Sequence, residues 1–585
     1  MRSNDSLGSP VVRRARRAGL IAVAACTALG GAVRAAPEAA AAAAKVAPVE
    51  ARAPAAKSAA PTWAAAPIAG SKAWPKGAPG RLVLLVSIDQ LRYQDLLTLA
   101  PEFGEGGFAG LGRPAPLRYD TAVTETAADH ATLSTGAWAE VHGVVANRWV
   151  DAGRFRQAID DPSCPLWERP DDGRGASVLR APTVGDSLKL ATSGRSKVVA
   201  VANKDRVALL LGGMAADLAL FWDDTAGRFT STTCYALKAP EWVEQLRKEH
   251  PASEYYTYVW NPSRPLEVLG NYSDLAAPGV QPRGRIGERF PHAVGQSEPG
   301  QRLWYALRQT PAATTLALAA AKAAVEAYPL GDGGTTDLLL LGIASVDGVG
   351  HQFGAHSPER VDTVLRLHDE LGAFLQWLRG RLGPRLQIVL TGDHGLQPIP
   401  AQSQKLHLDA KVLSRDDLAG QVERTLTAQL GAAPGGAWVD AFDPPYLSLK
   451  RTGTGDLDHT IHLAALALRK EPGLWRVVET ARALEQGGQG EPDFVRHALY
   501  PGRSGDLLLI PRPLYMLLKD DGADHGTPWN DDSMVPFLTQ TPGWTMRPQF
   551  EGGVLKATQV APTIAALLEV SPPSAAFAEP ALQRK

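Results

Sequence analysis

Acidic residues and histidines occur along this chain at spacings that suit metal ligands. The set consists of Asp89, Asp347, His351, Asp393, His394 and His525. Asp393 and His394 are adjacent, and the glycines between Asp347 and His351 would allow a tight turn that brings both onto one cation. Each residue alone is more simply a turn or structural residue. Together their oxygen and nitrogen atoms suit zinc, so the set predicts a site for two Zn²⁺ ions.

Thr126 offers a hydroxyl for the chemistry of such a site. Thr126 and Asp129 have the spacing of a helix N-terminus, where free N–H groups and a partial positive charge attract phosphate. On this segment alone, a capping role for Thr126 is the simpler alternative. Two metal ions about 4 Å apart can activate a hydroxyl and stabilise a departing oxygen. The combination predicts phosphoester cleavage through a covalent phosphothreonine, which water then hydrolyses.

Lys204, Arg206 and Asn147 are the predicted contacts to the phosphoryl group. Lys204 and Arg206 would neutralise its non-bridging oxygens, and Arg206 can do so through two parallel hydrogen bonds. Asn147 would donate one more hydrogen bond.

Three apolar runs, each of the kind that forms a buried parallel strand, end at one of the acids. The predicted strands are residues 81–89, 336–347 and 386–393. The segment 358–382 has helical periodicity, and a fourth strand, 196–203, leads directly to Lys204. Because open α/β sheets bind ligands beyond the carboxyl ends of their strands, we expect the acids to converge there. The predicted fold is α/β, with a mostly parallel central sheet flanked by helices and with inserted cap regions.

The 585 residues divide into an N-terminal leader and one large unit. Arginines before an apolar run make residues 1–35 a bacterial export signal, which predicts a periplasmic or secreted protein. A lipobox ending at Cys26 is the alternative to cleavage near residues 35–36, and only lipidation there would attach the protein to a membrane. Residues 36–70 are an Ala- and Pro-rich flexible linker. The catalytic domain is expected at 78–570, with insertions at about 207–305 and 400–500.

Composition restricts the partners. The net charge of −1 provides no field that would attract nucleic acid, and no stable protein partner is predicted. The expected ligands are small phosphoester substrates. After removal of the signal, Cys164 and Cys234 remain in a protein bound for an oxidising compartment, so we predict a disulfide between them; two buried free thiols are the alternative.

Seven short segments resemble one known family. They are Ser87 to Gln90, Thr126 with His130 and the Thr-Gly at 135–136, His142-Gly143 leading to Asn147 and Trp149, Lys204 to Arg206, Asp347 to His351, Asp393 to Gly395, and His525 to Asn530. The set resembles the alkaline phosphatase superfamily in its type I phosphodiesterase and nucleotide pyrophosphatase branch, and most closely the PafA kind of periplasmic phosphate monoesterase. That fold is a three-layer sandwich.

The resemblance also implies roles. One zinc would be held by Asp347, His351 and His525, and the other by Asp89, Asp393, His394 and the oxygen of Thr126. The Lys204 and Arg206 pair implies a dianionic monoester substrate, because diesterases of this branch lack the pair, and activity would rise toward alkaline pH. The alternatives are a phosphodiesterase or nucleotide pyrophosphatase with the same metals, and an inactive metal-binding scaffold.

Overall fold

The computed structural model describes residues 80–151, 153–274, 286–296, 300–451, 455–487, 490–518 and 522–585. The predicted export signal, the linker and Cys26 lie outside the described residues. Among the helices of the described part, none combines the length and the apolar character needed to cross a bilayer.

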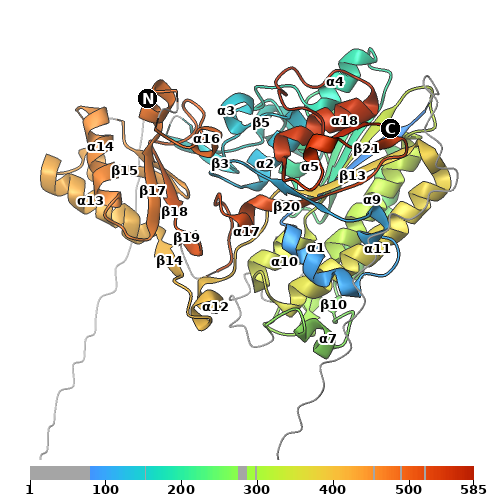
Figure 1. Cartoon of the computed structure of the whole chain (residues 1–585), viewed down its shortest axis with the longest axis horizontal. Helices are drawn as coiled ribbons and strands as arrows, with labels where there is room; N and C mark the ends of the chain where they lie inside the picture. Colours follow the sequence, from blue (N-terminus) through green and yellow to red (C-terminus); the bar gives the residue numbers. More distant parts are fainter. Residues whose placement is uncertain are drawn as a thin grey trace, which may run out of the picture. The chain divides into compact units, whose positions relative to one another are not determined.

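A nine-stranded sheet forms the centre of the described chain (Figure 1). Its order is β22 (Leu555–Lys556), β2 (Ala115–Arg118), β20 (Met534–Gln540), β13 (Leu386–Gly392), β1 (Leu82–Ile88), β12 (Asp337–Ile343), β7 (Val198–Ala202), β8 (Leu218–Asp223) and β9 (Arg228–Thr230). The five strands from β13 to β8 are parallel to one another. Every residue of β1, β7, β12 and β13 is buried, which explains their continuous apolar sequences. The predicted α/β fold is confirmed.

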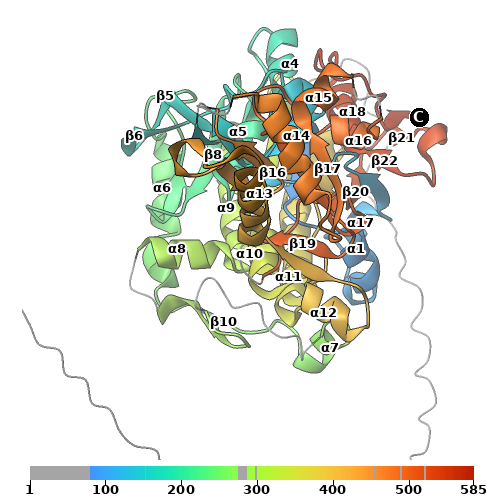
Figure 2. The same cartoon turned by 90° about the vertical axis from the view of Figure 1, so that its left-hand side faces the viewer.

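Helices cover both faces of this sheet, so the unit has three layers (Figures 1 and 2). Alternate residues of β1 point to opposite faces: Val83 and Leu85 belong to one core, and Leu82 and Leu84 to the other. The first core includes helices α2 (Thr126–Thr135), α4 (Val184–Ala191), α5 (Asp205–Gly212) and α18 (Val560–Leu568). The second includes α1 (Tyr93–Leu99), α9 (Ala312–Ala327), α10 (Ser345–Phe353) and α11 (Pro358–Leu382).

The two ranges predicted as insertions differ in content. The first, 207–305, begins inside the core, because α5, β8 and β9 pack in or on the central sheet. Its remainder has the short elements α6 (Glu241–Glu249), β10 (Val259–Trp260), α7 (Leu266–Gly270), β11 (His292–Ala293) and α8 (Gln301–Arg308). The second range, 400–500, contributes three strands of a separate sheet ordered β15 (Val439–Asp443), β16 (Tyr446–Leu449), β18 (Leu507–Pro511) and β17 (Leu474–Glu479), and β18 lies beyond the end of the range. Helices α13 (Arg415–Leu430) and α14 (Leu457–Leu468) pack on that sheet around their own apolar core.

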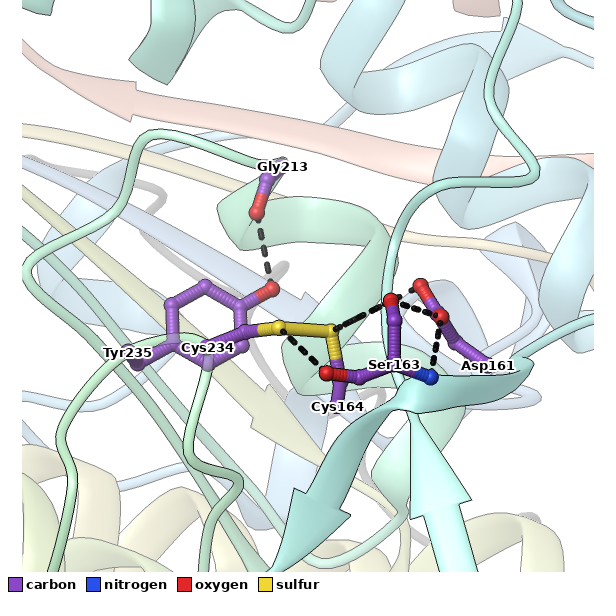
Figure 3. The surroundings of a disulfide bond; sticks show 6 residues. All are labelled: Asp161, Ser163, Cys164, Gly213, Cys234 and Tyr235. Carbon is purple, nitrogen blue, oxygen red and sulfur yellow. Dashed lines mark hydrogen bonds between the residues drawn. A yellow bond between two sulfur atoms is a disulfide. The ribbon is translucent and has the colours of Figure 1, made fainter.

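The predicted disulfide between Cys164 and Cys234 is present (Figure 3). Cys164 lies on β5 (Asp160–Leu166), which pairs antiparallel with β6 (Arg169–Arg174). The bond joins this hairpin to the chain segment that follows β9. It therefore fixes a surface hairpin to the edge of the central sheet.

Candidate active site

Two of the predicted acids lie at the ends of neighbouring parallel strands. Asp89 follows β1 and Asp393 follows β13, whose last residues are paired in register. Both carboxylates are buried, with 1% and 0% of the residue exposed. His394 comes next to Asp393, and its Nε2 lies 3.4 Å from Asp89 Oδ1 and 3.3 Å from Asp393 Oδ2. Strand pairing alone therefore brings these three side chains together.

The third acid, Asp347, is positioned by a helix. The prediction of a strand ending at Asp347 and a glycine turn after it is wrong, because β12 ends at Ile343 and residues 345–353 form α10. Asp347 lies in the first turn and His351 in the last, four residues apart on one face, with Nε2 3.1 Å from Asp347 Oδ1. A side chain at Gly350 would lie 1.8 Å from Gln90 Oε1. This glycine serves close packing of the helix on Gln90.

The three histidines lie side by side. The His394 and His525 rings stack with centroids 3.6 Å apart, and the His351 ring lies 5.1 Å from the His525 ring. His525 Nε2 also lies 3.8 Å from Asp347 Oδ1. Asp524, which the sequence did not single out, lies with its Oδ1 3.8 Å from His351 Nδ1.

These residues form three overlapping groups in which one potential ligand atom per residue lies within 4.8 Å of the others. The groups are Asp89, Asp393 and His394; Asp347, His394 and His525; and His351, Asp524 and His525. The first contains three of the four ligands expected for one zinc. The set expected for the other zinc, Asp347, His351 and His525, is divided between the remaining two groups. His525 belongs to both of them, with His394 as the third member of one and Asp524 as the third member of the other.

Thr126 lies beside the first two groups. Its Oγ1 is 3.4 Å from His394 Nε2 and 3.5 Å from Lys204 Nζ. Thr126 is the first residue of α2, and Glu125 occupies the position before the helix without a side-chain capping bond. The predicted capping role of Thr126 is therefore wrong: the N–H of Ala127 donates to Asn147 Oδ1 at 3.0 Å instead. The threonine hydroxyl lies beside His394, one of the candidate metal ligands.

Lys204 and Arg206 follow β7, the strand next to β12. Lys204 is buried, and its Nζ lies 2.7 Å from Asp89 Oδ2 and 2.5 Å from Asp347 Oδ2. Arg206 lines two cavities, of about 460 Å³ and about 290 Å³, that also share Asn147 and Gln157 as lining residues. The larger cavity also exposes His351 and His525, so it leads to the ligand groups.

Burial and mutual repulsion shape the charges of the site. Burial, with Asp347 and Asp393 adding repulsion, raises the pKa of Asp89 to about 8, and burial raises the pKa of Asp393 to about 7. Burial opposes ionisation of Asp347 too, but Lys204 and His351 hold its pKa well below the ordinary value. Burial lowers the pKa of His525 to about 4 and that of His394 well below 6.5, so both imidazoles are neutral near pH 7. Neutral imidazoles are the form that binds a metal ion.

The donor set fits divalent metal ions. Both oxygens of Asp89 and Oδ2 of Asp393 are buried and have no well-aligned hydrogen bond from the described residues, although Lys204 Nζ lies 2.7 Å from Asp89 Oδ2. The ammonium of Lys204 is shared between Asp89 and Asp347, and buried carboxylates are costly unless positive charge compensates them, so further cations would stabilise this group. Carboxylates beside neutral imidazoles would supply such cations with oxygen and nitrogen ligands.

Four residues with roles at this site were not assigned by sequence reasoning: Glu125, His130, Asp524 and Gln90. Glu125 Oε2 accepts the N–H of Asn147 at 2.7 Å, and His130 lies within hydrogen-bond distance of Ser87 Oγ and the carbonyl of Thr126. Each is within four positions of a residue that was assigned. Gln90 and His130 also belong to the segments that resemble the family, but neither this signal nor adjacency indicates which atoms each side chain contacts.

Gln90 connects the two acid positions. Its N–H donates to Asp393 Oδ1 at 3.0 Å and its Nε2 to Asp347 Oδ1 at 3.1 Å. The buried Arg360 in turn donates to Gln90 Oε1 at 2.7 Å, which fixes the orientation of the amide.

Gln90→Ala is expected to weaken the binding of a divalent metal ion by about 10- to 100-fold, as for other outer partners of metal ligands. The affinity can be measured by competition with a chromophoric chelator. Gln94→Ala is the matched control, because Gln94 is exposed and donates to Thr98 on the surface. Equal affinities for the two variants would show that Gln90 does not orient the acids.

The chain belongs to the type I phosphodiesterase / nucleotide pyrophosphatase family, whose model matches residues 83–535. It is therefore a phosphoric ester hydrolase. The predicted family resemblance is confirmed.

Particular relatives are alkaline phosphatases by name. Alkaline phosphatase PafA of Elizabethkingia meningoseptica is 29% identical over 528 residues, which are 86% of this chain and 93% of PafA. Alkaline phosphatase PhoV of Synechococcus elongatus is 28% identical over 515 residues, 84% of this chain and 91% of PhoV. The crystal structure of wild-type PafA matches with a TM-score of 0.77 and 27% identity, covering 87% of this chain and 99% of PafA.

Proposed function

We propose that the protein is an exported, zinc-dependent alkaline phosphatase that hydrolyses phosphate monoesters through a phosphothreonine at Thr126. The observation that carries this proposal is the position of the Thr126 hydroxyl, within 3.5 Å of both Lys204 Nζ and His394 Nε2. A nucleophile, a cation and a metal ligand thus meet at one point. The names of PafA and PhoV support the same activity.

Two zinc ions are proposed, one held by Asp89, Asp393, His394 and the Thr126 oxygen and the other by Asp347, His351 and His525. When bound, such ions supply Lewis acidity to the attacking hydroxyl and to the departing oxygen. Asp524 lies close enough to His351 and His525 to join the second group.

The chain's own residues orient the reactants. The N-terminus of α2 presents Thr126, and Asn147 accepts a hydrogen bond from the N–H of Ala127, which would hold this end of the helix, and with it the hydroxyl, in place for attack. Lys204 and Arg206 would bind the non-bridging oxygens of the phosphoryl group, and the amide nitrogen of Asn147 would donate one further hydrogen bond. Water then hydrolyses the phosphothreonine.

The substrate class follows from charge. A phosphate monoester carries one negative charge more than a diester, and a Lys and Arg pair matches that charge in a partly buried site. A diesterase is the second candidate, because the larger cavity has an apolar wall including Pro444, Pro445 and Met516 that could hold a second ester group.

Arg206→Ala is expected to lower turnover of an aryl phosphate by about 100-fold, because it removes charge-assisted hydrogen bonds to the extra negative charge. Turnover of the methyl aryl diester should fall far less. The measurement is kcat/KM for both substrates in the wild type and the variant. The matched control is Arg148→Ala, because Arg148 lines the same cavity but is paired with Asp443 at 2.6 Å. Faster diester than monoester hydrolysis by the wild type would overturn the monoesterase proposal.

Export to the periplasm or medium is part of this proposal and rests on the N-terminal sequence pattern. The Cys164–Cys234 disulfide supports it, because such bonds persist in oxidising compartments.

A further inference from the structure

Asp205 is the carboxylate nearest the backbone and side chain of Arg206. The N–H of Arg206 donates to Asp205 Oδ1 at 2.7 Å, and Arg206 Nε lies 3.7 Å from the same oxygen. Because Asp205 begins α5, its position is set by the helix and its carboxylate faces the smaller cavity. A lone carboxylate there would attract the guanidinium away from a bound phosphoryl group.

Arg174 forms an ion pair with the carboxylate of Asp205. It reaches Asp205 from the end of β6, with its Nη1 donating to Asp205 Oδ2, and Asp172 accepts two further hydrogen bonds from it. Burial alone would raise the pKa of Asp205, but Arg174 and Arg206 hold it below the ordinary value, so the carboxylate is ionised. With its charge matched by Arg174, Asp205 can hold the Arg206 backbone without neutralising its side chain.

The hairpin that carries Arg174 is fixed at a second point. Cys164 on β5 is bonded to Cys234, and Tyr235 Oη donates to the carbonyl of Gly213 at 2.8 Å (Figure 3). Gly213 is the residue that follows the last turn of α5. The β5–β6 hairpin and its disulfide-bonded segment therefore hold both ends of α5, through Asp205 at the start and Gly213 at the end.

We propose that Arg174 and Asp205 are positioning residues, which direct the Arg206 guanidinium toward the phosphoryl group and leave its charge available. This inference rests on the proposed function. It assigns to the disulfide-anchored hairpin a part in monoester selectivity.

The test is Arg174→Gln, which keeps hydrogen-bonding capacity and removes the charge. The kcat/KM of an aryl phosphate should fall by about tenfold, as for a misplaced orienting group, while that of the methyl aryl diester stays unchanged. Arg174→Lys, which keeps the charge, should recover part of the loss. Arg381→Gln is the control, because Arg381 also pairs with a carboxylate, that of Asp332 at 2.8 Å, but lines neither cavity.

A double-mutant cycle with Arg206→Ala separates this inference from the proposed function. If Arg174 acts through Arg206, Arg174→Gln should cost nothing further in the Arg206→Ala background. An undiminished cost there, or equal losses on monoester and diester, would overturn the positioning role. If Arg206→Ala alone spares monoester turnover, the proposed function fails at its first step. Melting curves of each variant establish that the protein is folded, and should Arg174→Gln unfold, Arg174→Lys in both backgrounds provides the same comparison.

Discussion

Thr126→Ala is expected to abolish the phosphoenzyme and to lower monoester turnover by at least about a thousandfold, as the loss of a nucleophile does in other covalent enzymes. The reason is geometric: the Thr126 hydroxyl lies within 3.5 Å of both Lys204 Nζ and His394 Nε2. Acid quenching during turnover, followed by mass spectrometry of the peptide that contains residue 126, detects the intermediate.

Two variants control for folding of the helix. Thr126→Ser keeps the hydroxyl and should still form a phosphoenzyme. Thr132→Ala removes a hydroxyl of the same helix that donates to the carbonyl of Ala128, and it should keep most of the activity. A phosphorylated residue elsewhere, or turnover by Thr126→Ala near the wild-type rate, would refute the assignment of the nucleophile.

Removal of metal ions is the second change with a large expected effect. A chelator should abolish turnover and lower the melting temperature, and zinc should restore both. A ligand at about 1,000 times its Kd stabilises the folded state by about 4 kcal/mol per site. Calorimetry with and without chelator measures this difference.

The difference in stability between the metal-bound and the metal-free protein should increase as pH rises. In the metal-free protein, burial raises the pKa of Asp89 to about 8 and of Asp393 to about 7, from an ordinary value of 3.8. The stability that these protonated groups contribute is present below pH 4 and is lost as pH rises through about 8. Metal binding has the opposite dependence, because protons compete with the cation. A difference in stability that decreases between pH 5 and pH 8 would contradict this account.

Two asparagine variants make the comparison specific. Asp89→Asn removes a ligand and should eliminate most of the thermal response to zinc. Asp129→Asn is the matched control: Asp129 is buried and outside the three ligand groups, and burial raises its pKa well above the ordinary value. Its response to zinc should match the wild type.

The fold class and the residues that lie together at the site could be predicted from the sequence. The apolar periodicity located the strands, and ligands of open α/β sheets bind beyond the carboxyl ends of the strands. The apolar runs of β1, β12 and β13 were identifiable because both faces of each strand are buried. The spacing of Asp347 and His351 was noticed but interpreted as a turn, since two glycines lower helix propensity. Tertiary packing against Gln90 and Gln309 decided otherwise, and local sequence does not contain that information.

The boundaries of the first predicted insertion, 207–305, could not be located from local sequence for a similar reason. β8 and β9 are short strands at the sheet edge, in a region whose Trp and Pro content obscured their period. The partner of Asp205 was equally inaccessible, because Arg174 lies 31 residues earlier and reaches it only through the hairpin fold.

Asp89 and Asp393 end adjacent strands, and neighbouring strands in any sheet lie about 4.8 Å apart. The lateral separation of these carboxylates is therefore dictated by main-chain geometry, which side-chain substitutions scarcely alter. The residues that line the cavities and the additional sheet can change while the separation of the two carboxylates stays the same. A scaffold of this kind is an advantageous starting point for engineering new ester specificities, since its most exacting dimension is preserved by the polypeptide backbone itself.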